Sequence, residues 1–226
     1  MQIDIDNLDY ESLAGCDEVG RGPLAGPVVG ATVYINTDDK ANSKELLECL
    51  RELGVADSKK LTTKKRKKII EELKIDLTSI NQLVKIVYKD FKFSYSIHEV
   101  SETKIDEINI LNASLLAMKN SFIDCFDRTS AKLLIDGNKE LKDMPKEIEM
   151  EAVVKGDSKS VLIGLASVIA KEYRDDLMQA LGVKYPGYGL EKHAGYPTKQ
   201  HREAIVELGV TPIHRKSFKG VKEYLL

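Results

Sequence analysis

The sequence predicts a mixed α/β fold, in which a central sheet of parallel and antiparallel strands is flanked by helices and followed by a small helical C-terminal extension. Apolar runs of strand length alternate along the chain with longer stretches of helical periodicity. Short turns separate the first strands, which favours antiparallel neighbours. The 226 residues are enough for one large domain with an appendage. We expect a domain over residues 1–182, with a loop and helices over 183–226 packed on it.

Strands are predicted where β-branched and aromatic residues cluster, at residues 13–17, 27–35, 83–88, 93–100, 132–135 and 149–154. Helices are predicted at residues 44–53, 62–73, 103–126, 158–181 and 198–208. In the third helix, apolar residues recur at spacings of three and four, which describes one buried face. In the last helix, Thr198 is a suitable N-cap and Gly209 a stop.

Composition places the chain among soluble globular proteins and excludes several classes. Hydrophobic residues make up 42% and charged residues 31% of the chain. No apolar run approaches the roughly 20 residues that span a bilayer, and the acidic N-terminus does not resemble a signal peptide. Three widely spaced cysteines predict reduced thiols, neither a disulfide framework nor a zinc site. We expect a cytoplasmic protein that needs no membrane.

A basic run at residues 59–68 is the most uneven feature of the charge distribution. Seven of its ten residues are lysine or arginine, although the net charge of the chain is only -2. A solvated helix face explains such a run without any ligand. Because no acidic residue interrupts it, the run also favours a surface that faces phosphate groups.

Acidic residues recur at the ends of predicted strands, each beside a glycine. Asp17 and Glu18 precede a glycine-rich turn, and Asp136 and Asp157 follow later strands. If these strand ends share one edge of the sheet, the carboxylates form an oxygen-ligand pocket, which Mg²⁺ or Mn²⁺ prefers. Carboxylates so close together would need a cation or raised pKa values.

Each acid also has a simpler interpretation. The Asp17–Glu18 pair fits a solvated turn, Asp136 fits a turn with the glycine that follows it, and Asp157 fits the N-cap of the next helix. Only their joint recurrence after apolar strands favours a metal site.

Five motifs, in order, resemble those of bacterial type 2 ribonuclease H, the ribonuclease HII family. They lie at residues 15–28, 56–61, 135–138, 155–160 with the helix that follows, and 195–201. The resemblance runs from about residue 13 to residue 218. It implies a ribonuclease H-like fold and endonucleolytic cleavage of RNA in RNA–DNA hybrids, or at a single ribonucleotide in duplex DNA, leaving 3′-hydroxyl and 5′-phosphate ends.

The resemblance also implies roles for individual residues. The four family carboxylates correspond to Asp17, Glu18, Asp136 and Asp157, which would bind two divalent ions, Mg²⁺ or Mn²⁺. The family residues that recognise the 2′-hydroxyl correspond to Gly20, Arg21 and Gly22. The family tyrosine, which stacks on the next sugar, corresponds to Tyr196. Residues near the backbone phosphates correspond to Lys59 and Lys60. The expected partners are RNA–DNA hybrid and ribonucleotide-containing duplex DNA, bound by a monomer.

Two features do not follow from the resemblance. Residues 38–53 are longer than the usual loop before the second motif, and we interpret them as a surface insertion. The first motif begins by residue 15, which favours type 2 over ribonuclease HIII, whose extra domain would precede it.

Other classes are less consistent with the sequence. A non-catalytic nucleic-acid-binding module of the same fold would gain nothing from four acids facing phosphates. A nuclease acting on DNA junctions would not need a 2′-hydroxyl reader. A dinucleotide site needs a helix after its glycines, whereas residues 27–35 predict a strand. The four histidines lack metal-ligand spacing, and His201 is expected at the surface or as a capping residue.

Overall fold

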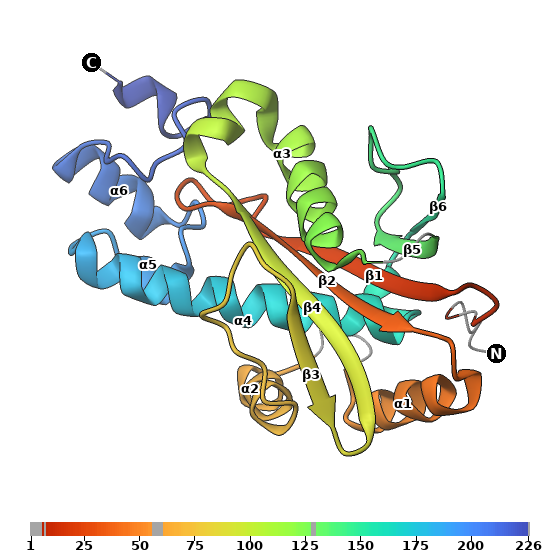
Figure 1. Cartoon of the computed structure of the whole chain (residues 1–226). Coiled ribbons are helices and arrows are strands. Elements are labelled where there is room, and N and C mark those ends of the chain that lie inside the picture. Colours follow the sequence, from red (N-terminus) through yellow and green to blue (C-terminus); the bar gives the residue numbers. More distant parts are fainter. Residues whose placement is uncertain (1–5, 7, 56–60, 128–129, 226) are drawn as a thin grey trace.

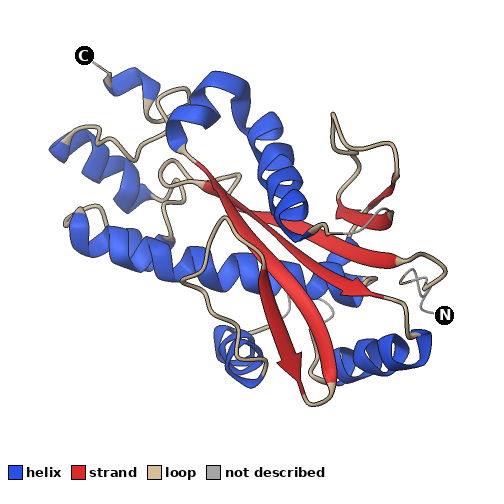
Figure 2. Ribbon diagram, viewed as in Figure 1, coloured by secondary structure: helices blue, strands red, loops and turns tan. Residues whose placement is uncertain are grey.

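The computed structural model describes residues 6, 8–55, 61–127 and 130–225. Within them one mixed sheet contains six strands: β1 (Ser12–Val19), β2 (Val28–Asn36), β3 (Val84–Tyr88), β4 (Phe91–Val100), β5 (Ala131–Asp136) and β6 (Ile148–Val153). The strand order is β3-β4-β2-β1-β5-β6. Neighbours from β3 to β1 are antiparallel, whereas β5 runs parallel to both β1 and β6. The predicted mixed sheet is therefore confirmed (Figures 1 and 2).

Helices flank this sheet and continue beyond it. The α-helices are α1 (Lys40–Glu52), α2 (Thr63–Glu72), α3 (Glu102–Cys125), α4 (Val161–Lys184), α5 (Leu190–His193) and α6 (Lys199–Leu208), and the 3₁₀ turns are η2 (Gly156–Ser158) and η3 (Lys222–Tyr224). Hydroxyl side chains cap several N-termini by accepting a backbone N–H three residues on, as Thr198 does at α6. Gly209 ends α6 with a φ of 86°, as the sequence predicts.

The two longest helices cover opposite faces of the sheet (Figure 1). Alternate residues of β1 point to opposite faces, so Leu13 packs in the core on the α4 side and Ala14 in the core on the α3 side. Gly15 brings α4 very close, because a Cβ there would lie 2.4 Å from the backbone nitrogen of Ile163. Gly30 does the same for α3, against the backbone of Ala117. The centre of the sheet is thus held between two long helices.

Three predicted elements differ from the structure. The helix expected from residue 158 begins at Val161, because Ser160, and not Asp157, provides the cap. Within α3, Asn109 has a φ of 65° and interrupts the helix. Its side chain then accepts a hydrogen bond from the backbone N–H of Asn112, so it caps the second part. The expected surface insertion includes α1, which buries Leu46, Leu47 and Leu50 in the core.

The C-terminal segment packs against the turn that follows β1. Its apolar residues share a core cluster with Leu24 and Ala25 from the turn and with Met178 from α4. His201, expected at the surface, is fully buried. A hydrogen bond of 3.2 Å joins its Nε2 to Nε2 of His214, and its ring stacks on His193 with centroids 4.8 Å apart. The helix periodicity did not reveal this burial, because the residues that cover His201 come from other segments.

Within the described ranges, no helix combines the length and the apolar character needed to cross a membrane.

Candidate active site

The adjacent acids Asp17 and Glu18 lie near the end of β1, inside the sheet. They pair across the ladder with Ala31 and Gly30 of β2, so the strand continues two residues past its predicted end. Strand alternation directs the two side chains to opposite faces. Ser167 of α4 hydrogen bonds to Asp17 on one face. Glu18 has α3 on its side and also lines a small cavity of about 110 Å³ that α3 residues border.

The third acid, Asp136, is the last residue of β5. Because β5 runs parallel to β1 with Ile135 opposite Cys16, the end of β5 lies beside the acid pair. The Oδ1 atom of Asp136 accepts a 2.7 Å hydrogen bond from the backbone N–H of Gly156. The turn after β6 is therefore tied to the end of β5.

One cavity of about 390 Å³ joins most of the predicted site. Seven predicted residues line it: Asp17, Glu18, Gly20, Arg21, Gly22, Asp136 and Tyr196. They come from β1, the turn after it, β5 and the loop before α6. The sheet edge thus brings together residues that are 179 positions apart in the chain, the separation of Asp17 and Tyr196.

The remaining predicted residues have other positions. Asp157 lies in η2 and is 2% exposed; it does not border the 390 Å³ cavity. Its neighbour Gly156 donates to Asp136, so the Asp157 backbone adjoins the site. Lys59 and Lys60 lie outside the described residues.

The acid cluster concentrates negative charge, which affects the pKa values of its carboxyl groups. Burial, followed by repulsion from Asp136 and Glu18, raises the pKa of Asp17 well above its usual range. Burial also raises the pKa of Glu18 to about 6, against the opposing effect of Arg21. Arg21 Nη1 lies 3.3 Å from Glu18 Oε1 in a partly exposed ion pair. These carboxylates carry a free-energy cost that a bound cation would relieve.

The donor set fits a hard divalent cation, although the carboxylates are not arranged as a finished site. Across the described part of the chain, no group of three or more histidine, cysteine, aspartate or glutamate residues is placed to hold a metal ion. Each of the three carboxylates instead contacts a protein donor: Asp17 the backbone N–H of Glu18, Glu18 Arg21, and Asp136 the N–H of Gly156. Their carboxylate oxygens are nevertheless the ligands that Mg²⁺ or Mn²⁺ prefers, and a bound cation would relieve the charge repulsion that raises the pKa of Asp17 and of Glu18.

Sequence reasoning missed three polar residues of the cavity, Arg66, Ser167 and Lys171. Ser167 and Lys171 are four residues apart on α4 and therefore share one helix face. That spacing could have identified them once Asp17 was known to face α4. Arg66 belongs to the basic run but, unlike its four lysine neighbours on α2, is buried.

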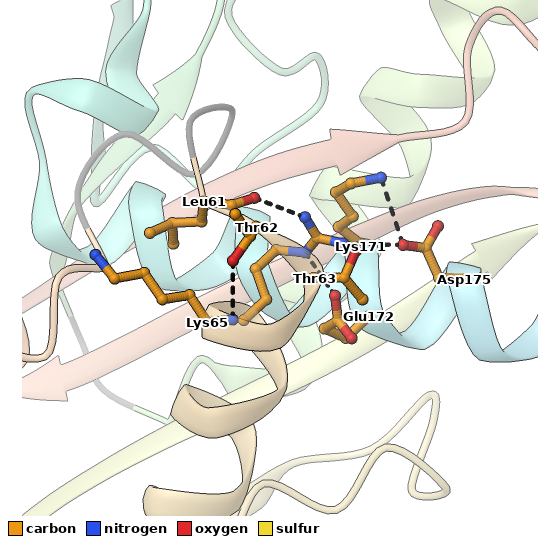
Figure 3. Close-up of polar contacts among 8 residues, drawn as sticks. Leu61, Thr62, Thr63, Lys65, Lys171, Glu172 and Asp175 are labelled. Atoms are coloured by element: carbon orange, nitrogen blue, oxygen red, sulfur yellow. Dashed lines mark hydrogen bonds and ion pairs between the residues drawn. The ribbon is translucent and has the colours of Figure 1, made fainter.

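Arg66 connects α2 to α4 through a polar network, and Figure 3 labels its partners Glu172 and Asp175. Its Nε donates to Glu172 Oε1 at 2.5 Å, and its Nη2 lies 3.2 Å from Asp175 Oδ2. Lys171 Nζ lies 3.5 Å from the same Asp175 oxygen. The arginine also donates to the carbonyl oxygen of Leu61 at 2.9 Å, just before the Thr62 cap of α2. The buried pairs hold the basic helix beside the cavity.

The glycine–arginine turn and Tyr196 form one wall of the cavity. Gly20 has a φ of 96°, which favours glycine. A Cβ on Gly22 would lie 3.2 Å from Cε1 of Tyr196, so the tyrosine ring rests against this turn. The ring is 47% exposed and is available to a ligand.

The profile of the family described as Ribonuclease HII matches residues 14–221. The chain belongs to the ribonuclease HII family. A relative from Desulfotalea psychrophila, named Ribonuclease HII, is 44% identical over 100% of this chain and 88% of its own length. Another from a Ruegeria species, with the same name, is 43% identical over 96% of this chain and 81% of its own length.

Solved structures agree on the fold. The ribonuclease H2 of Pyrococcus horikoshii is 25% identical, with a TM-score of 0.66 over 94% of this chain and 96% of that one. The ribonuclease H-like fold is therefore established. Membership in the ribonuclease HII family makes the chain a metal-dependent hydrolase, an endoribonuclease that acts on RNA–DNA hybrids.

Proposed function

We propose that this site incises the strand at the phosphodiester 5′ of a ribonucleotide, both in RNA–DNA hybrids and at a single ribonucleotide in duplex DNA. The products would carry 3′-hydroxyl and 5′-phosphate ends. The observation that carries the proposal is that three carboxylates, the glycine–arginine turn and Tyr196 line one cavity. The acids and the groups that recognise sugar therefore meet at one place.

The carboxylates would bind the divalent ions, and other residues of the cavity would bind the substrate. Asp17, Glu18 and Asp136 would hold the divalent ions, Mg²⁺ or Mn²⁺, through their carboxylate oxygens, with Asp157 as the fourth family carboxylate. When bound, two such ions activate the attacking water and stabilise the leaving oxygen. Ser167 keeps Asp17 oriented by its hydrogen bond.

Substrate selection would depend on the cavity wall that the glycine–arginine turn and Tyr196 form. The backbone of Gly20–Gly22 and the Arg21 side chain would contact the ribose 2′-hydroxyl, which is the group that distinguishes RNA from DNA. Tyr196 would stack on the sugar of the next nucleotide and favour an RNA-to-DNA junction. Lys171 and Arg66 also line the cavity, each of them paired with an acidic residue of α4, and a phosphate bound there would lie beside these cations. Since one chain supplies every lining residue, we propose that the enzyme acts as a monomer, which sedimentation velocity would test.

A duplex cleavage assay tests the function. The purified protein is given Mg²⁺ or Mn²⁺ and a labelled DNA duplex with one ribonucleotide, and we expect a single cut at its 5′ phosphodiester. The all-deoxy duplex and a reaction with chelator are the controls, and both should stay intact. If the ribonucleotide-containing duplex stays intact both with Mg²⁺ and with Mn²⁺, the proposal is overturned and a non-catalytic binding module is favoured.

A further inference from the structure

Two buried arginines hold the turn that follows β1 by its carbonyl oxygens. Arg215 donates from Nη2 to Gly20, from Nη1 to Arg21 and from Nε to Gly26, at 2.6, 3.1 and 2.9 Å. Arg174 of α4 donates to the carbonyl oxygens of Pro27 and Ala25 at 3.2 and 3.1 Å, and to Ala194 at 3.0 Å. Ala194 lies two residues before Tyr196, so Arg174 also connects the loop that contains Tyr196 to the turn.

These guanidinium groups are unusual in their environment. Arg174 is 1% exposed and Arg215 0%, and no ion pair of the described residues involves either one. Burial lowers the pKa of Arg215 to about 9, so its charge is retained at neutral pH. A buried charge costs free energy unless it is compensated. Here backbone carbonyl oxygens provide the compensation, which makes the turn and the arginine depend on each other.

Because peptide bonds are planar, the contacts of Arg215 with the carbonyl groups also fix the direction of the N–H groups in the turn. The peptide bonds of the described residues are all trans, and in a planar trans peptide the C=O and the N–H point in opposite directions. The carbonyl groups of Gly20 and Arg21 point inward to Arg215. The N–H groups of Arg21 and Gly22, which belong to the same two peptide planes, must therefore point away from Arg215, on the side of the cavity that both residues line. Neither N–H donates a hydrogen bond to another residue of the described chain.

We propose that Arg215 is a positioning residue for ribose recognition: it fixes two successive peptide planes so that the N–H groups of Arg21 and Gly22 donate to the ribose 2′-oxygen. This inference rests on the proposed function, because it assigns the reading of the 2′-hydroxyl to those two donors. Arg174 supports the same wall by joining the turn to the Tyr196 loop. A residue that contacts no substrate thus sets the selectivity for RNA.

A binding experiment separates this role from simple stabilisation. Asp136→Asn serves as the background, so that the substrate is not cut, and Arg215→Lys is added to it. Lysine keeps the positive charge but cannot donate to three carbonyl groups arranged around a planar fork. We measure the dissociation constants for duplex DNA with one ribonucleotide and for the same all-deoxy duplex. The ratio of the two constants should fall by about three- to tenfold, the equivalent of one hydrogen bond.

The control is Phe93→Leu, a buried position in β4 beside the end of β2 that is farthest from the turn, since Ser94 pairs with Tyr34 whereas Val100 pairs with Val28. It lowers stability through packing, so the ratio should stay at the background value. An unchanged ratio in Arg215→Lys would overturn the inference. If the background protein itself does not prefer the ribonucleotide duplex, the proposed reading of the 2′-hydroxyl fails instead, and the two failures are distinguishable.

A second measurement does not depend on the folding of a variant. In ¹⁵N-labelled Asp136→Asn protein, the amide resonances of Arg21 and Gly22 should shift on addition of the ribonucleotide duplex and shift less with the all-deoxy duplex. Equal shifts with both duplexes would show that these amides do not sense the 2′-hydroxyl, which would also overturn the inference.

Discussion

At the scale of single residues, the site is organised around carboxylates that are crowded together. Asp17 and Glu18 reach opposite sides of β1, yet both line the main cavity because it opens at the strand end, where Asp136 from β5 also arrives. Burial is the largest cause of the raised pKa values of Asp17 and Glu18; repulsion from Asp136 adds to both, and Arg21 opposes the rise at Glu18. A folded protein tolerates this cost where binding of a cation compensates it.

Asp136→Asn should abolish cleavage while leaving duplex binding and folding intact. The amide keeps the shape of the side chain and its acceptor for Gly156 but loses the negative charge. Turnover should fall to background in Mg²⁺ and Mn²⁺, whereas thermal stability of the metal-free protein should be equal or higher, because one repulsive charge is gone. Asp90→Asn on an exposed turn is the matched control. Wild-type turnover in Asp136→Asn would remove Asp136 from the site.

Tyr196→Ala should reduce cleavage mainly on the single-ribonucleotide duplex. Stacking of one aromatic side chain on a base contributes about 1–3 kcal/mol, and a contribution of that size on the sugar corresponds to roughly 5- to 150-fold in kcat/KM. Long hybrids offer many registers and should lose less. Tyr185→Ala, a change at the C-terminal end of α4 and outside the cavity, should leave both substrates nearly unaffected. An equal loss on both substrates would argue against a junction role for Tyr196.

At the scale of elements, the buried histidines show how the C-terminal segment is held together. His214 is 1% exposed and accepts hydrogen bonds at Nδ1 from the backbone and hydroxyl of Thr211. Burial, followed by the nearby His201, lowers the pKa of His214 to about 4. The pKa of His201 is lowered as well, chiefly by burial. This packing requires neutral rings.

The stability that His214 contributes should therefore fall in acid, whereas the raised pKa values of Asp17 and Glu18 act in the opposite direction. Because the folded pKa of His214 lies below the ordinary value of about 6.5, its contribution is complete above pH 6.5 and is lost as the pH falls towards 4. The free energy of unfolding in urea is measured at pH 7, 6 and 5 for the wild-type protein and for His214→Gln, and the difference between them should shrink as the pH falls. His214→Gln should unfold more easily at pH 7 but show a shallower loss between pH 7 and 5. Parallel curves for the two proteins would show that this histidine does not titrate on unfolding.

At the scale of the whole molecule, charge is distributed so that positive residues stand beside the acid site. The exposed lysines of α2 are Lys64, Lys65, Lys67 and Lys68. Arg66 fastens their helix to α4 next to the cavity. The overall negative charge of the chain therefore does not oppose nucleic-acid binding, because phosphates would meet this local surface.

Removal of two of these lysines should weaken the salt dependence of duplex binding. For Lys64→Gln/Lys68→Gln in the Asp136→Asn background, the slope of log affinity against log salt should decrease by about one for each phosphate that a lysine no longer neutralises. Lys85→Gln/Lys92→Gln, on the β3–β4 hairpin, changes the net charge equally and should leave the slope unchanged. Identical slopes for the two double variants would make the α2 lysines an ordinary solvated surface.

Local patterns in the sequence were sufficient for most of the framework. Strand composition, helical spacing and capping residues identified every strand and long helix within a few residues, because these signals depend on neighbours in the chain. The motif order was sufficient for the family and for seven residues that line the cavity. The segment expected as a surface insertion also contributes one face of α1 to the core, through Leu46, Leu47 and Leu50; which surface that face covers is known only from the tertiary structure.

The sequence by itself determined the chemical groups of the candidate site: the carboxylates, the glycine turn and the exposed tyrosine. Only the tertiary structure decided how these groups are held. The burial of His201, the place of Arg66 at the cavity and the six hydrogen bonds from Arg174 and Arg215 all join segments distant in the chain. Local periodicity does not predict such contacts, because they form only when packing brings separate segments together.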